Sequence, residues 1–219
     1  LLLAVPGSGK TTVLVTRLGY MLCCCGIPAD KILTMTYTKA ATREMRQRFA
    51  RLFGEDCPDI PKFRTINGVS SKIIDFYART HSSGNAFRLM EDEGLLSKLV
   101  SDLYRALSGE FATQGVIKEL RKNITYAKNS MLDKEEIDDL DTGFEKFPEL
   151  YRRYNLALRK QHWMDYDDQM VYAKTILEKH ADVLTHFQDM FPYICVDESQ
   201  DTSRIQHSII QLLSQKSGN

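Results

Sequence analysis

The sequence lacks any apolar run of roughly 18 residues, the length that a membrane-spanning helix needs. It also lacks an excess of charge of either sign, because 29 lysine and arginine residues balance 29 aspartate and glutamate residues. A net charge of zero gives no overall attraction to nucleic acid. Any nucleic-acid surface must therefore be local, and the segment 39–51 is locally basic, with five basic residues and one acidic residue.

Cysteine is present, but not in the pattern of a disulfide framework. Cys23, Cys24 and Cys25 are adjacent, and adjacent cysteines do not easily pair or ligate one metal ion, while Cys57 and Cys195 stand alone. This pattern favours a reducing compartment, so we expect a cytoplasmic protein. No metal-ligand spacing is visible among the histidines, which are His81, His162, His180, His186 and His207.

Apolar strands and helices alternate at both ends of the sequence. Strands are expected at 1–5, 31–37, 62–66 and 193–196, and helices at 12–22, 39–53, 69–79, 165–180 and 203–213. Such alternation is typical of a parallel sheet with crossover helices on both faces. The first motif begins almost at once and there is no starting methionine, so we expect the chain to be part of a longer protein.

The middle of the chain has a different pattern. Between residues 87 and 162 there is no convincing strand, and helices are expected at 94–107, 114–129, 134–140 and 147–160. The sequence therefore predicts an α/β domain interrupted by an all-helical inserted subdomain. The expected boundaries are 1–85 for the first part of the α/β domain, 86–162 for the helical insertion and 163–219 for the second part.

A glycine-rich turn, residues 4–11, follows the first expected strand and opens the first expected helix. This context is typical of the phosphate-binding loop of P-loop NTPases. The glycines let backbone N–H groups approach a phosphate, Lys10 adds a positive charge, and the Thr11 hydroxyl can ligate Mg²⁺. The expected cofactors are ATP and Mg²⁺. The predicted nucleotide-binding residues are Pro6, Gly7, Ser8, Gly9, Lys10, Thr11 and Thr12.

Two acidic residues, Asp197 and Glu198, follow the apolar segment 193–196. In open α/β sheets ligands bind at the carboxyl ends of the strands, so these carboxylates are expected to meet the phosphate-binding loop. We predict that Asp197 holds Mg²⁺, while Glu198 orients and deprotonates the attacking water.

Five segments resemble, in the same order, the motifs of UvrD/Rep-like superfamily 1 helicases. They are 4–12, 36–45, 65–68, 164–168 and 197–202. Val5 and Asn67 depart from the family pattern, which commonly has glycine and histidine at these places. The resemblance implies a RecA-like P-loop fold with the accessory helical subdomain at the insertion. It also implies ATP-driven movement on single-stranded DNA with duplex unwinding, in DNA repair or recombination.

The resemblance also assigns residues and partners. Gln200 would couple the nucleotide to bound DNA, so the predicted catalytic set is Lys10, Glu198 and Gln200. The predicted DNA-binding residues are Thr36, Tyr37, Thr38, Lys39 and Asn67. An aromatic ring flanked by hydroxyls and a cation suits stacking on single-stranded bases. Single-stranded DNA, duplex junctions and a second RecA-like domain of the same protein are the implied partners.

Three alternatives remain open from the sequence. The first is the motor subunit of a recombination-type helicase–nuclease, which shares these motifs. The second is a P-loop nucleotide switch or binding module that does not unwind DNA. The third is a small-molecule kinase, which leaves the segments 36–45 and 197–202 without an explanation.

Overall fold

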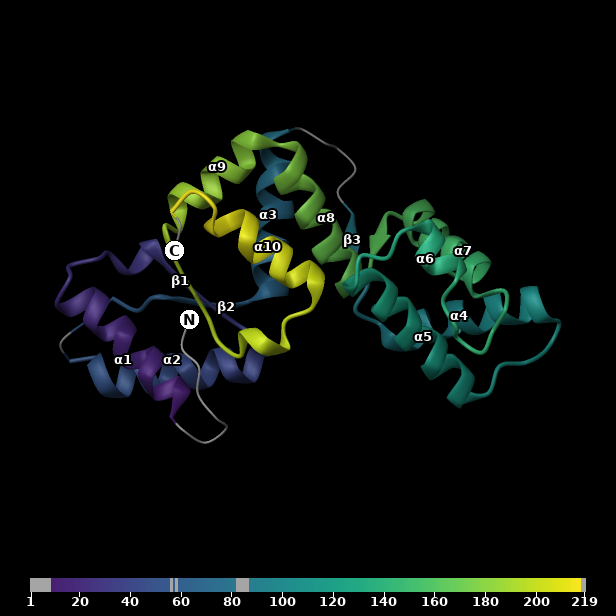
Figure 1. The fold of residues 1–219 in the computed structure, drawn as a ribbon, viewed down its shortest axis with the longest axis horizontal. Coiled ribbons are helices and arrows are strands. Elements are labelled where there is room, and N and C mark those ends of the chain that lie inside the picture. Colours follow the sequence, from purple (N-terminus) through teal and green to yellow (C-terminus); the bar gives the residue numbers. More distant parts are fainter. Residues whose placement is uncertain (1–8, 56, 58, 82–86, 218–219) are drawn as a thin grey trace.

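The computed structural model describes residues 9–55, 57, 59–81 and 87–217. The protein is mixed α/β, mostly helical, with a small parallel sheet. Figure 1 shows two bodies, one around the sheet and one built from helices α4 to α7. The strand expected at 1–5 and the residues Pro6, Gly7 and Ser8 lie outside the described residues. None of the helices in the described part is long and apolar enough to cross a bilayer.

The main sheet has β1 (Ile32–Thr36) at its centre. β2 (Lys62–Thr65) and β5 (Tyr193–Val196) both pair with it in parallel. Within the described residues the strand order is β2-β1-β5. All three carboxyl ends therefore lie at one edge of the sheet.

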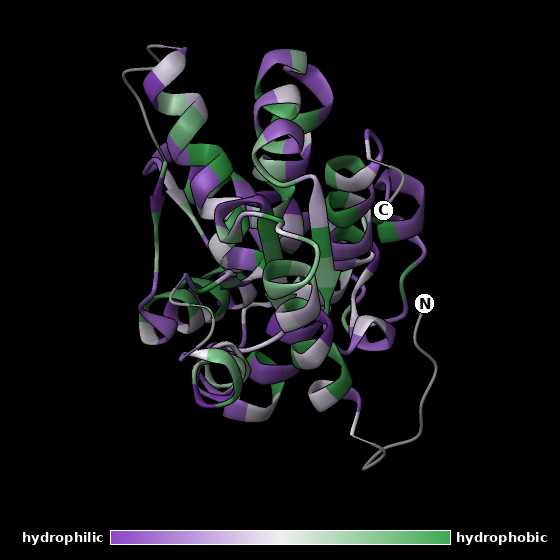
Figure 2. Cartoon of the chain, turned by 90° about the vertical axis from the view of Figure 1, so that its left-hand side faces the viewer, coloured by the Kyte–Doolittle hydropathy of each residue, from purple (hydrophilic) through white to green (hydrophobic). Residues whose placement is uncertain are grey.

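Helices cover both faces of this sheet. One face carries α1 (Lys10–Cys23) and α2 (Lys39–Phe53), and the other carries α3 (Ile66–Thr80), α8 (Tyr166–Lys179), α9 (Ala181–Met190) and α10 (Arg204–Ser214). Successive residues of β1 point to opposite faces, so Ile32 joins the core under α1 while Leu33 and Met35 join the other core. Figure 2 shows the hydrophobic central strands enclosed by these helices.

The second body has its own hydrophobic core. It consists of α4 (Glu93–Ser108), α5 (Gln114–Asn129), α6 (Lys134–Asp138) and α7 (Phe147–Lys160). The short strands β3 (Arg88–Leu89) and β4 (Trp163–Met164) connect it to the body around the sheet. Val100, Phe147 and Leu150 are fully buried at the centre of the second body. The expectation of no strand in 87–162 was wrong at one place, because β3 pairs in parallel with β4. A strand of two residues is too short to show an alternating pattern.

Local capping explains where several helices begin. The side chains of Thr38, Thr65 and Asp165 accept backbone hydrogen bonds in the first turns of α2, α3 and α8. The sequence predicted one helix at 165–180 and left the following segment unassigned, where the structure has α9. Two 3₁₀ turns complete the elements, η1 (Ala29–Lys31) and η2 (Ser199–Asp201).

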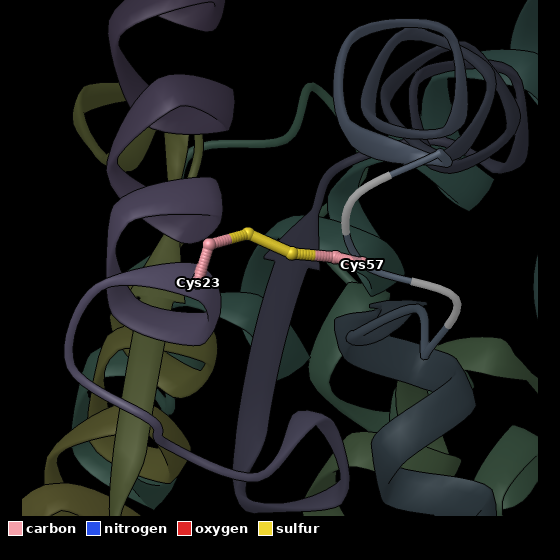
Figure 3. Close-up of a disulfide and its surroundings, with 2 residues drawn as sticks. All are labelled: Cys23 and Cys57. Carbon is pink, nitrogen blue, oxygen red and sulfur yellow. A yellow bond between two sulfur atoms is a disulfide. The ribbon is translucent and has the colours of Figure 1, made fainter.

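A disulfide joins Cys23, at the end of α1, to Cys57, which follows α2 (Figure 3). Their Cα atoms are 6.4 Å apart, although 34 residues separate them in the sequence. The expectation that Cys57 stands alone was therefore wrong. The pairing depends on α1 and α2 lying side by side on one face of the sheet, which cysteine spacing does not reveal. Cys24 and Cys25 are exposed free thiols.

Candidate nucleotide site and nucleic-acid groove

Lys10 reaches the acidic residues at the carboxyl end of β5. Its Nζ donates to Glu198 Oε2 over 3.0 Å, across 188 residues of sequence. The Gln200 side-chain amide donates to the same carboxylate oxygen. The structure therefore brings together the three residues that the sequence predicted to be catalytic.

The backbone at this end of β5 is tightly defined. The Asp197 N–H donates to the Met35 carbonyl over 2.9 Å and so extends the pairing of β5 with β1. Glu198 has φ 50°, in the left-handed region that non-glycine residues rarely adopt. Such conformations cluster at functional sites, where the surrounding structure maintains them. Here the left-handed turn directs the Glu198 carboxylate towards Lys10.

The two adjacent carboxyls have opposite electrostatic environments. Burial raises the pKa of Asp197, and the neighbouring charge of Glu198 raises it further. Hydrogen bonds from Gln200 and Lys10 lower the pKa of Glu198. A cation beside Asp197 would offset its burial and keep it charged. The Asp197 carboxylate and the Thr11 hydroxyl are the hard oxygen donors that Mg²⁺ prefers, so these residues fit that ion.

A cavity of about 580 Å³ lies beside β5 and between α1 and α10. Its charged and amide lining comes from Lys10, Arg17, Asp197, Glu198 and Gln200. The volume falls within the range of roughly 300–1,000 Å³ that is usual for small-molecule sites. Because the cavity runs along β5, this strand is only half-buried, whereas the central strand β1 is fully buried.

The start of α1 has features that suit an anion. Its N-cap residue is Gly9, with φ 82°, so no N-cap side chain bonds to the first N–H groups. The first turn contains no acidic residue. The N–H groups of a first helical turn and the positive end of the helix dipole favour a phosphate. The hydroxyl of Thr12, another predicted nucleotide-binding residue, accepts a hydrogen bond from Arg48 of α2 over 3.2 Å.

A second cavity, of about 500 Å³, collects three of the predicted DNA-binding residues, Tyr37, Lys39 and Asn67. Tyr37 follows β1 and is 59% exposed. The groove lies between the two bodies, because Thr125 and Asn129 of α5 line it as well. We call this cavity the interbody groove.

The other two predicted DNA-binding residues hold the turn after β1. Thr36 is buried, and its hydroxyl is 2.6 Å from the Thr42 hydroxyl, so the structure does not expose its side chain. Thr38 is exposed, and its hydroxyl accepts from the Ala41 N–H over 3.0 Å. Asn67 donates to the Tyr166 carbonyl over 3.0 Å. The two threonine bonds fix the turn that carries Tyr37 and Lys39, whereas the Asn67 bond joins the start of α3 to the start of α8.

Sequence reasoning missed a buried cation next to the groove. Lys128 of α5 is 4% exposed, and its Nζ lies 2.7 Å from oxygens of both Asp165 and Asp168. Burial raises the pKa of Tyr154, so its hydroxyl stays protonated and donates to Asp165 over 2.9 Å. Lysine on a helix is normally exposed, so no pattern marked Lys128 as the partner of the two aspartates.

Burial alone would lower the pKa of Lys128, but the charges of Asp165 and Asp168 outweigh it and raise the pKa. The neighbouring Asp167 accepts from Thr125 and Asn129 of α5, over 2.7 Å each. These contacts attach the helical body to the start of α8.

Comparison with known proteins decides the family. A model described as the UvrD/REP helicase N-terminal domain matches residues 1–219. The chain belongs to this family. The resemblance inferred from the five motifs is thus confirmed.

Similar curated proteins carry helicase names. ATP-dependent DNA helicase PcrA of Leuconostoc citreum is 29% identical over 224 residues, covering 100% of this chain and 29% of the relative. ATP-dependent DNA helicase Rep of Buchnera aphidicola subsp. Baizongia pistaciae is 26% identical, and the match covers 100% of this chain and 32% of the relative. PcrA of Bacillus subtilis is 27% identical, and the match covers 99% of this chain and 29% of the relative. The chain therefore spans about three tenths of the length of these relatives.

Proposed function

We propose that this chain is the ATP-binding part of an ATP-dependent DNA helicase or translocase, which couples ATP hydrolysis to movement on single-stranded DNA and to duplex unwinding. The observation that carries the proposal is the 3.0 Å contact between Lys10 and Glu198 at the carboxyl end of β5. Family membership supports it, because the matched relatives are named ATP-dependent DNA helicases.

The proposed fold is a RecA-like P-loop domain formed by 1–85 and 163–219, with 86–162 as a helical insertion. The parallel order β2-β1-β5 and the helices on both faces support this assignment. The separate core of α4 to α7 supports the insertion.

At the nucleotide site, the turn 6–12 would bind the phosphates, with the start of α1 facing them. Lys10 now pairs with Glu198, and a triphosphate would offer Lys10 a stronger anionic partner. The Glu198 carboxylate would then be available to accept a proton from water, while Gln200 continues to orient it. Mg²⁺, held by Thr11 and Asp197, would neutralise charge on the β- and γ-phosphates.

At the interbody groove, the exposed Tyr37 ring would stack on a base and Lys39 would contact a phosphate. Thr36 and Thr38 would act mainly by fixing the turn that carries these two residues, and Asn67 by joining the start of α3 to the start of α8. A second RecA-like domain would close the nucleotide site and donate arginines, and a duplex junction would be the substrate for unwinding.

The test compares charge-removing substitutions in the full-length protein. Lys10→Ala should abolish ATP binding, whereas Glu198→Gln should bind ATP but lose about 10²–10⁴-fold in turnover. The matched controls are Lys118→Ala and Glu145→Gln, which change exposed residues of the helical body. ATPase is measured with and without single-stranded DNA. Unchanged turnover in either site variant contradicts the roles assigned to Lys10 and Glu198. An ATPase rate that single-stranded DNA does not change contradicts the motor function.

A further inference from the structure

Three side chains of metal-ligand type meet on the sheet-bearing body, where α3 ends and α8 joins α9. His81 follows α3, His180 lies between α8 and α9, and Asp182 is in the first turn of α9. One ligand atom of each lies within 4.8 Å of the others. About a hundred residues of sequence separate His81 from the other two, so spacing could not have revealed the cluster.

The hydrogen bonds around His81 define its ring. Thr80 donates its hydroxyl proton to the Phe76 carbonyl over 2.9 Å. The Thr80 oxygen, 2.9 Å from His81 Nδ1, is then the acceptor of the Nδ1 proton. A neutral ring in this tautomer has its lone pair on Nε2. That nitrogen lies 3.3 Å from Asp182 Oδ2, so a lone pair would face a carboxylate unless a proton or a metal ion lies between them.

The geometry suits a metal ion. A tetrahedral site with metal–ligand distances of about 2.0–2.1 Å has neighbouring ligands about 3.3–3.4 Å apart, which matches the separation of His81 Nε2 and Asp182 Oδ2. Metal-bound histidines usually donate their other N–H to a fixed acceptor, as His81 does to Thr80. Tyr77 packs against both imidazoles, with ring centroids 4.5 Å away, and so orients them.

We propose that His81, His180 and Asp182 bind one divalent transition-metal ion, with Zn²⁺ as the best match, and that water completes its coordination. Two imidazoles and one carboxylate form a donor set that suits Zn²⁺ better than Mg²⁺. This site is separate from the Mg²⁺ site proposed at Thr11 and Asp197. The bound ion would tie the end of α3 to the α8–α9 junction and stabilise the sheet-bearing body.

The test titrates metal-free protein with Zn²⁺ by calorimetry and follows the melting temperature. One ion should bind per chain and raise the melting temperature, because a ligand that binds only the folded state stabilises it. His180→Asn and Asp182→Asn should each weaken binding at least about tenfold and reduce the thermal shift. His207→Asn, an exposed histidine on α10, is the matched control and should bind as the wild type does.

Cysteines also bind Zn²⁺, so a second experiment distinguishes binding at the proposed site from binding by the exposed cysteines. A Cys24→Ser/Cys25→Ser variant should keep the affinity, and Co²⁺ in place of Zn²⁺ should give a spectrum without thiolate charge-transfer bands. Absence of Zn²⁺ binding by the wild type overturns the proposal, as does binding that is lost only in the cysteine variant. Asp182 is exposed, so Asp182→Asn is expected to fold; unchanged affinity in this variant also overturns the proposal.

Discussion

Replacing Lys128 with methionine removes one buried charge while keeping most of the volume of the side chain. The Asp165 and Asp168 carboxylates, now 2.7 Å from the ammonium group, would be left in the interior without a counter-charge. Removing one partner of a buried ion pair typically costs about 3–5 kcal/mol. We expect the free energy of unfolding to fall by this amount, which is a large part of the ~5–15 kcal/mol that is typical of a folded domain.

The loss should depend on pH. In the wild type, burial alone would raise the pKa of Asp165, but the Lys128 charge outweighs it and lowers the pKa. Asp165 thus contributes stability above its unfolded pKa, and this stability is lost as pH falls through the folded pKa. Burial already raises the pKa of Asp168 in the wild type. Without Lys128, burial raises the pKa of both carboxyls. In the variant, the two carboxyls then contribute stability at pH values below their unfolded pKa. They lose this contribution as pH rises through their raised pKa in the folded state. The gap between variant and wild type should therefore narrow from neutral pH towards about pH 4.

Urea unfolding at both pH values measures this gap. Lys118→Met, at an exposed position of the same helix, is the control and should stay within about 0.5 kcal/mol of the wild type. Adding Asp165→Asn and Asp168→Asn to Lys128→Met should restore much of the loss, because the carboxylates are then neutral and asparagine still caps α8. A loss below about 1 kcal/mol, or one independent of pH, would refute the reasoning.

Two further predictions concern the turn after β1. Tyr37→Ala in the full-length protein should weaken the binding of single-stranded DNA about 5- to 150-fold, because stacking on one base contributes ~1–3 kcal/mol. The matched control is Tyr20→Ala, since Tyr20 is 60% exposed on α1 and lies outside the groove lining. An equal loss of affinity in both variants would count against the stacking role. Thr38→Ala should lower the free energy of unfolding by about 1 kcal/mol, because α2 loses its N-terminal cap. Thr16→Ala, at an exposed position of α1, is the control and should leave this free energy unchanged. Equal stability of the two variants would contradict the capping role of Thr38.

Sequence patterns located the elements that carry long periodic signals and capping residues. The helices predicted at 39–53, 114–129 and 147–160 have the bounds of α2, α5 and α7, and the strand predicted at 193–196 is β5. Each of the three helices has enough residues for its period to be visible, and Thr38 and Thr113 mark the starts of two of them. The segment 193–196 shows no period and was located as a continuous apolar run followed by two acidic residues.

The features that sequence patterns missed depend on contacts between distant segments. β3 and β4 are two residues each and exist only as a pair. Lys128 becomes a buried cation because α5 packs against the start of α8, and the same residue type elsewhere on a helix would be exposed. The motif residues predicted that Lys10 and Glu198 would meet, but not that Gln200 shares the same carboxylate or that Thr36 is buried beneath its turn.

Both candidate sites lie at one edge of the sheet, because the residues that follow parallel strands emerge on the same side. Asp197 and Glu198 follow β5, and Tyr37 follows β1. The Asp197 N–H donates to the Met35 carbonyl, and Met35 is only two residues before Tyr37. A rearrangement of the backbone at Asp197 must therefore shift or break this bond. The β1–β5 pairing, which this bond extends, therefore connects the acidic end of β5 to the turn that carries the exposed tyrosine.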